Sequence, residues 1–187
     1  MWRGSVAVIV MVASACGRLP LLAQSPTYGL GRTPAADEIK TWDSAIGPDG
    51  KELPPGSGTA AAGREIYAAK CASCHGRTGK EGPYDVLVGG QGTLHSKKPL
   101  KTIGSYWPFA TTVWDYINRA MPYDKPGTLT ADEVYALTGY MLFLNGVIRE
   151  NDVMNAKTLP QVRMPNRHGF IPDPRPDWKP RSGAEQP

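Results

Sequence analysis

The chain has 187 residues and a formal net charge of +4, and its basic residues are scattered along it. This length leaves room for one domain of moderate size. The charge pattern gives no footprint of nucleic-acid binding, so we expect no nucleic-acid partner. No internal repeat is present.

Residues 1–23 are predicted to be a signal peptide. Arg3 supplies a positive charge, residues 6–13 are an apolar run, and Ala13-Ser14-Ala15 matches a cleavage pattern. The apolar run is short for a membrane-spanning helix. Cleavage just before Cys16 would suit a lipid-modified cysteine, so membrane attachment is expected only if Cys16 is lipidated. Both versions predict export to the periplasm.

Residues 24–58 are rich in proline and glycine and are predicted to form an irregular N-terminal arm. A short helix is expected over residues 34–42, with Thr33 as its cap and with Asp37 and Glu38 in its first turn. The arm is either a linker or a segment that lies on a partner or on the domain. Three residues that look ordered favour the second interpretation: Tyr28, Trp42 and Leu53.

The motif that carries the chemistry lies in a predicted domain spanning residues 59–148. A helix over residues 59–70, in which Gly63 would admit another helix beside Tyr67, leads into Cys71-Ala72-Ser73-Cys74-His75. This C-x-x-C-H pattern is typical of covalent haem attachment, because Cys71 and Cys74 can each form a thioether and His75 can then bind the iron. We therefore expect one covalently bound haem c with its iron.

A zinc site and a redox dithiol are two other interpretations of C-x-x-C, and both fit this sequence less well. A zinc site needs further ligands at matched spacing, and a redox dithiol is expected in a βαβ context. No βαβ pattern surrounds the motif, and the remaining cysteine and histidines are isolated along the chain: Cys16, His95 and His168.

The region after the motif offers supporting residues. A metal-bound imidazole normally donates its other N–H, and the carbonyl of Pro83 is the predicted acceptor for His75. Tyr106 and Trp107 carry an O–H and an N–H that would suit a buried haem propionate, although simple packing explains them equally well. His95 stands beside two lysines and is expected at the surface.

Met121 is the predicted second iron ligand. It follows a predicted helix over residues 111–120, whose residues Val113, Trp114 and Ile117 should face inward and whose Asp115 and Arg119 should face outward. A thioether is a soft, neutral ligand, and Pro122 after it forces an extended loop. The competing methionines lie in a helix or in the tail: Met141, Met154 and Met164.

The last predicted helix runs to about Leu144. Thr130 and Glu133 form a capping box, and Asn145-Gly146 should end the helix. Its apolar face should cross the helix of Gly63 and consists of Val134, Leu137, Tyr140, Met141 and Leu144. The order of haem motif, methionine loop and C-terminal helix resembles a class I cytochrome c domain. The predicted fold is therefore all-α, with irregular arms on both sides.

A narrower resemblance rests on several short sequence segments, among them residues 28–32, 53–58, 104–108 and 165–178. Residues 104–108, for example, read Gly-Ser-Tyr-Trp-Pro. These segments resemble the cytochrome subunit of bacterial sulfur-compound dehydrogenases, the sulfane dehydrogenase of the thiosulfate-oxidising (Sox) system and sulfite dehydrogenases. The resemblance implies a molybdopterin-containing dehydrogenase subunit as electron donor and a downstream cytochrome or oxidase as acceptor. Longer Sox-type subunits carry a second haem domain, so this single-haem chain leaves sulfite and other sulfur compounds open as the substrate.

Residues 149–187 form a predicted proline-rich tail, either disordered or used for docking on a partner. The resemblance favours docking, with four spaced apolar anchors: Met164, Phe170, Ile171 and Trp178. The chain itself is expected to transfer electrons without being a complete catalyst. A free periplasmic electron carrier remains an alternative, as does a self-sufficient haem enzyme or sensor, which would need Met121 absent or displaced.

Overall fold

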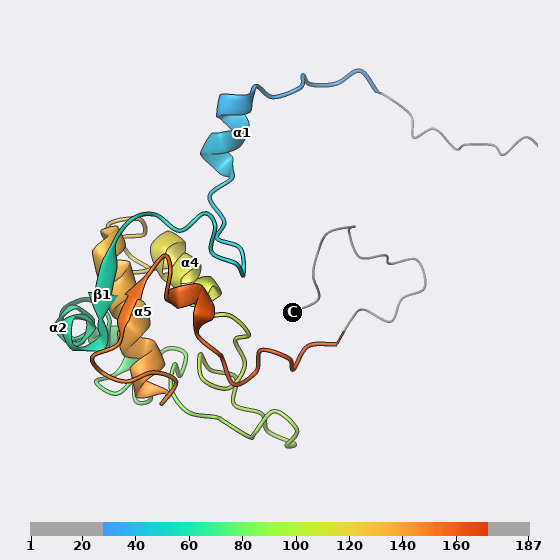
Figure 1. Cartoon of the computed structure of the whole chain (residues 1–187). Coiled ribbons are helices and arrows are strands. Elements are labelled where there is room, and N and C mark those ends of the chain that lie inside the picture. Colours follow the sequence, from blue (N-terminus) through green and yellow to red (C-terminus); the bar gives the residue numbers. More distant parts are fainter. Residues whose placement is uncertain (1–27, 172–187) are drawn as a thin grey trace, which may run out of the picture.

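A computed structural model of the chain describes residues 28–171 (Figure 1). The predicted signal peptide, Cys16 and Trp178 lie outside the described residues. The elements follow in the order α1 (Ala36–Trp42), β1 (Ser57–Thr59), α2 (Ala60–Lys70), α3 (Ala72–His75), α4 (Ala110–Ala120), α5 (Ala131–Leu144), β2 (Val153–Asn155) and the 3-10 helix η1 (Leu159–Gln161). No helix between residues 28 and 171 is long and apolar enough to cross a membrane.

Helix α5 is the centre of the packing. Its capping box forms as predicted, because Thr130 Oγ1 accepts from the Glu133 amide at 3.3 Å and Glu133 accepts from the Thr130 amide at 2.9 Å. The predicted one-sided apolar face is too narrow, since every residue of α5 from 134 to 142 is buried. The helix is buried all round because α2, α4 and the two strands all contact it.

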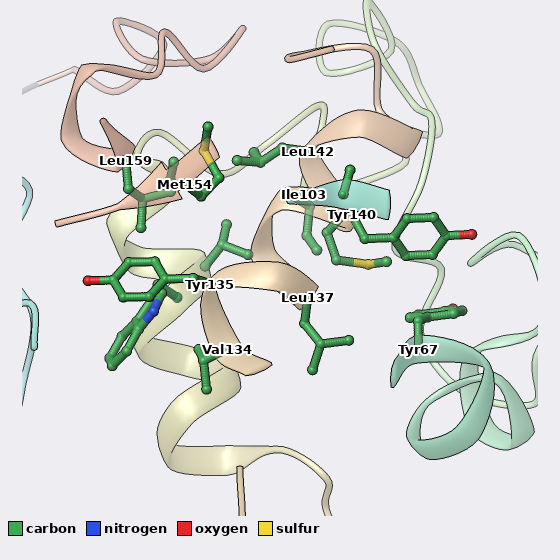
Figure 2. Close-up of a cluster of buried hydrophobic side chains, with 14 of the residues drawn as sticks. Tyr67, Ile103, Val134, Tyr135, Leu137, Tyr140, Leu142, Met154 and Leu159 are labelled. Carbon is green, nitrogen blue, oxygen red and sulfur yellow. The ribbon is translucent and has the colours of Figure 1, made fainter. Parts of the chain in front are cut away.

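The predicted crossing of α2 and α5 is confirmed. A Cβ added to Gly63 would lie 2.1 Å from the carbonyl oxygen of Ala136, so the two backbones touch at this point. The rings of Tyr67 and Tyr140 pack beside the contact with centroids 5.3 Å apart (Figure 2). Helix α2 is capped by Thr59, whose Oγ1 accepts from the Ala62 amide at 3.3 Å.

Helix α4 begins one residue earlier than predicted and buries Val113 and Trp114 as expected. The outward orientation predicted for Asp115 is wrong, because its side chain is buried. Its carboxylate is satisfied there, since it accepts from the Ile46 amide at 3.2 Å and from Arg119 Nε at 2.9 Å.

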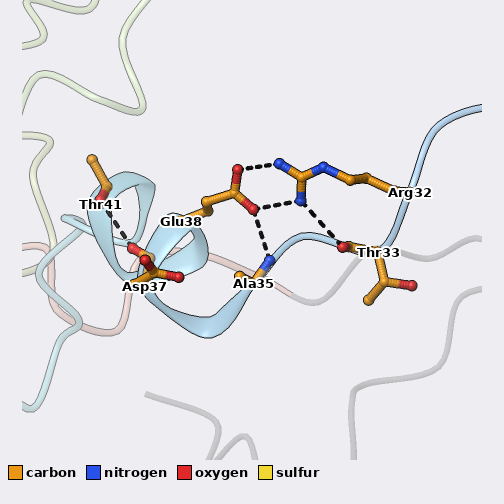
Figure 3. A network of polar contacts seen from close by, with 6 residues as sticks. All are labelled: Arg32, Thr33, Ala35, Asp37, Glu38 and Thr41. Carbon is orange, nitrogen blue, oxygen red and sulfur yellow. Dashed lines mark hydrogen bonds and ion pairs between the residues drawn. The ribbon is translucent and has the colours of Figure 1, made fainter.

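The predicted cap of α1 is also wrong. Its N-terminal capping residue is Ala35, so Thr33 stands too far upstream to reach the free amides of the first turn. Instead, Glu38 accepts from the Ala35 amide at 2.8 Å (Figure 3). Asp37 and Glu38 lie in the first turn, as predicted.

The two flanks of the predicted domain pack together. Strand β1 pairs antiparallel with β2, with Ser57 opposite Asn155 and Thr59 opposite Val153. This short sheet is an addition to the all-α class that the sequence indicates. Four side chains from outside residues 59–148 enter the core: Leu53, Met154, Leu159 and Met164. Met164 is therefore an anchor within its own domain and not for a partner, while Phe170 and Ile171 are exposed.

Candidate haem site

The C-x-x-C-H motif is a single helical turn at the end of α2. Cys71 separates α2 from α3 and donates its amide to the Tyr67 carbonyl at 2.9 Å. The amides of Cys74 and His75 both donate to the Cys71 carbonyl, at 3.1 and 3.0 Å. This turn presents the two thiols together, with Cys71 half-buried and Cys74 exposed.

The surroundings of Cys71 hold the motif in place. Burial raises the pKa of the Cys71 thiol to about 11, although Lys70 partly opposes this shift. The Tyr67 hydroxyl donates to the Gly76 carbonyl at 2.9 Å, just beyond the motif. Burial also raises the pKa of Tyr67, so this hydroxyl stays protonated and keeps its hydrogen bond.

His75 is fixed by a backbone carbonyl, but not by the predicted one. Its Nδ1 lies 3.0 Å from the carbonyl oxygen of Asp85, two residues beyond Pro83. The loop folds back so closely at Gly82 that a Cβ there would lie 2.1 Å from the Cys74 carbonyl oxygen, and Pro83 is exposed. We assign the Nδ1 proton to the Asp85 hydrogen bond, which leaves Nε2 as the metal-binding nitrogen.

Met121 lies directly after α4, at the start of the loop that ends at Thr130. It is extended, with φ −122° and ψ 148°, and its amide still donates to the Ile117 carbonyl at the end of α4. Its side chain is half-buried, whereas the other methionines within residues 28–171 are buried in the core: Met141, Met154 and Met164. Binding of Met121 to the iron remains a prediction.

Tyr106 and Trp107 are half-buried and make ring contacts. Tyr106 packs edge-on against Phe170 with centroids 5.3 Å apart, and Trp107 packs edge-on against Tyr116 at 5.6 Å. Lys101 Nζ lies 5.0 Å from the centre of the Tyr106 ring. These ring contacts are what simple packing of the two residues predicts. A hydrogen bond from either residue to a haem propionate remains a prediction. His95 is exposed, as expected.

Asn145 supports the site and was not identified from the sequence beyond its place at a helix end. Its side-chain oxygen accepts from the Gly89 amide at 3.0 Å. Its amide nitrogen donates to the Leu87 carbonyl at 3.2 Å and to the Met141 carbonyl at 2.9 Å. The residue thereby ties the loop after the haem motif to the last turn of α5. An asparagine before a glycine at a helix end is the only signal that the sequence offered.

The donor set fits haem c. Two thiols on one turn match the two attachment points of the cofactor, and a histidine with a free Nε2 matches its proximal ligand. The half-buried Met121 thioether would give the iron a soft ligand of the kind that electron-transfer cytochromes use. Within residues 28–171, no group of three or more histidine, cysteine, aspartate or glutamate side chains could hold a metal ion.

Comparisons with known proteins agree with this site. Residues 58–141 match the family model described as "Cytochrome C oxidase, cbb3-type, subunit III". No curated protein matches the chain. A chain in the crystal structure of the sulfane dehydrogenase SoxCD from Paracoccus pantotrophus superposes with a TM-score of 0.71 and is 43% identical. The match covers 86% of this chain and 80% of that one.

The chain belongs to the c-type cytochrome family, for which haem c with its iron is the cofactor and electron transfer the activity. Within this family it is similar to the cytochrome subunit of the sulfane dehydrogenase, SoxD.

Proposed function

We propose that this chain is a periplasmic cytochrome with one covalently bound haem that accepts electrons from a molybdenum-cofactor dehydrogenase acting on sulfite or a related sulfur compound. It passes them to a soluble cytochrome or to a terminal oxidase. The observation that carries this proposal is the 43% identity to a chain of SoxCD over 86% of this chain, together with an intact C-x-x-C-H turn. A lipid anchor at Cys16 is compatible with the same role.

The residues of the site have separate roles. Cys71 and Cys74 would tether the cofactor, and the Asp85 carbonyl orients His75 so that Nε2 is left to bind the iron. Met121 would supply a second iron ligand. The haem iron supplies a one-electron redox centre when it is bound. If His75 and Met121 both bound the iron, no position would be left for a substrate, and the role of this chain would be electron transfer between partners.

The number of electrons released by the substrate is consistent with separate catalytic and electron-transfer subunits. Oxidation of sulfite to sulfate takes one oxygen atom from water and releases two protons and two electrons. The catalytic subunit takes both electrons, whereas a single haem accepts one at a time. We therefore expect the cytochrome to be reduced and reoxidised twice for each sulfite consumed.

The test uses the haem-loaded chain and a molybdenum-cofactor dehydrogenase subunit of the SoxC type from the same organism. Sulfite or thiosulfate is added without oxygen, and reduction of the haem is followed by its optical spectrum. We expect rapid reduction that requires both the catalytic subunit and one of the sulfur compounds. If dithionite reduces the haem but no sulfur compound does so through the catalytic subunit, the chain is a free carrier for other partners. If the untreated protein is high-spin and binds carbon monoxide, it is a haem enzyme or sensor.

A further inference from the structure

The segment from Tyr28 to Ala45, named here the projecting arm, carries apolar side chains that nothing in the described chain covers. Helix α1 has no buried residue and stands apart from the other elements (Figure 1). Its Trp42 is 87% exposed and Ile39 is 51% exposed, and Leu30 upstream is 89% exposed. Solvent exposure of several large apolar side chains within so short a segment marks a contact surface.

The arm is nevertheless shaped by its own contacts. Arg32 Nη1 donates to Glu38 Oε2 at 2.7 Å, and the Thr41 hydroxyl donates to the Asp37 carbonyl at 3.0 Å (Figure 3). A helix of seven residues is too short to be stable by itself in water. Its local bonds therefore reduce the cost of adopting a shape that is stabilised when the arm packs against something else.

The packing face of α1 is defined by the spacing of its residues. Ile39 and Trp42 are three residues apart and so lie on the same side of the helix. They line a hollow of about 700 Å³ with apolar and charged neighbours: Arg32, Pro34, Glu38 and Asp43. The apolar floor with charged residues around it is the arrangement found in protein interfaces.

The likeness to a chain of a dehydrogenase complex indicates which kind of partner fits this face. The match to the SoxCD chain covers 86% of this chain. That share exceeds the compact part from Ile46 to Arg167, so the arms are included in the likeness to a chain solved within a dehydrogenase complex.

We propose that the projecting arm docks on the molybdenum-containing catalytic subunit, with Ile39 and Trp42 of α1 inserted into an apolar groove of that subunit. This inference rests on the proposed function, because it names the surface by which that complex is held together. A tryptophan at the centre of such a contact commonly carries a large share of the binding energy.

The experiment measures binding of the haem-loaded full chain to the molybdenum-cofactor catalytic subunit used in the test above, by titration at fixed ionic strength. We expect Trp42→Ala to raise the dissociation constant at least tenfold and Ile39→Ala to raise it severalfold. The matched control is Lys40→Ala, which shortens an exposed side chain of the same helix but leaves Ile39 and Trp42 in place, and it should stay within twofold of wild type. The haem spectrum of each variant should be unchanged, because α1 makes no buried contact with the domain.

The possible outcomes distinguish a wrong docking surface from a wrong proposed function. If wild type and Trp42→Ala bind the catalytic subunit equally, the arm is not the docking surface, while the proposed function still stands. If the wild-type chain does not bind the catalytic subunit, the proposed function fails first. Sedimentation of the cytochrome alone gives a further test, because a dimer that Trp42→Ala dissolves would show that a second copy occupies this face and would overturn the proposal.

Discussion

His75 and Met121 are held in different ways. One imidazole nitrogen of His75 is hydrogen-bonded to the Asp85 carbonyl, whereas Met121 is held through its backbone, whose N–H donates to the Ile117 carbonyl. A thioether ligand raises the reduction potential of haem iron, and Met121 bound to the iron would keep small molecules from binding it. The identity of this ligand therefore decides whether the chain transfers electrons or binds a small molecule.

We expect Met121→Ala to remove the weak far-red methionine–iron band of the oxidised protein, to lower the reduction potential, and to permit carbon monoxide binding. Optical spectra of the oxidised and reduced protein measure all three effects when combined with a redox titration. Met164→Leu is the control, because Met164 is buried in the core and its sulfur should not reach the iron. If Met121→Ala keeps the band, a different methionine binds the iron.

At Gly63, helix propensity and tertiary packing predict opposite changes in stability when the glycine is replaced by alanine. Alanine is favoured over glycine within a helix by about 1 kcal/mol. At position 63, however, the added Cβ would lie 2.1 Å from the Ala136 carbonyl oxygen and force α2 away from α5. We expect Gly63→Ala to reduce the free energy of unfolding by about 3 kcal/mol, the upper part of the range for overpacked cores.

Denaturant unfolding of the haem-loaded protein measures this effect. The reverse exchange at an exposed position of the same helix, Ala68→Gly, should cost only about 1 kcal/mol. A stabilised Gly63→Ala protein would show that the two helices are not in contact at this point.

Between elements, Glu133 joins the first turn of α5 to the last turn of α2. It completes the capping box with Thr130 and also receives a hydrogen bond from Lys70 Nζ at 2.7 Å, next to the haem motif. The Lys70 ammonium group, with the Thr130 amide, holds the pKa of Glu133 below its ordinary value of 4.5. A carboxyl group with a lowered pKa in the folded state stabilises the protein above its unfolded-state pKa, and this contribution is lost as the pH falls through the folded-state pKa.

We therefore expect Glu133→Gln to lower the free energy of unfolding at pH 7 and to have progressively less effect as the pH falls below 4.5. Because both side chains are partly exposed to water, the effect at pH 7 should be below about 1 kcal/mol. Unfolding curves at a series of pH values provide the measurement, and Glu65→Gln on the exposed side of α2 is the control. A constant difference across this pH range would mean that the ionised carboxylate contributes nothing beyond the amide that replaces it.

At the scale of the whole molecule, local signals and long-range packing were not equally readable from the sequence. The spacing of Cys71, Cys74 and His75, and the capping box at Thr130, are local patterns that determine a turn or a helix start by themselves. The Asp85 carbonyl could not be found in this way, because every residue has a carbonyl and only the path of the loop selects one. The burial of Asp115 likewise depends on Ile46, which is far away in the sequence.

The flanking segments show the same limit more strongly. Prolines and few apolar residues predict irregular structure, and most of residues 43–56 and 145–171 is irregular. Composition cannot show, however, that β2 pairs with β1 or that Met154 and Leu159 enter the core beside α5 (Figure 2). The division at residues 58 and 149 follows the helical pattern, whereas the packing continues across both positions.

This packing predicts which part of the chain folds by itself. A shortened chain of residues 59–148 retains every residue of the haem motif and of α5, but it lacks Leu53, Met154, Leu159 and Met164. It therefore leaves the core positions that these side chains fill open to water. Loss of even one such buried side chain typically costs about 2–5 kcal/mol, which is comparable to the whole stability of a small domain. A chain of residues 46–171 keeps all four side chains and loses only the projecting arm and the two ends that lie outside the described residues.

We expect the 46–171 chain, exported with a common signal and loaded with haem, to unfold cooperatively within a few degrees of the full chain. The 59–148 chain should show no cooperative transition. Thermal unfolding followed by circular dichroism and by haem absorbance distinguishes the two. A cooperative transition of the 59–148 chain near that of the full protein would show that the flanking segments only cover a core that is already complete. A large loss of stability in the 46–171 chain would instead mean that the projecting arm packs on its own domain and is not free to dock on a partner.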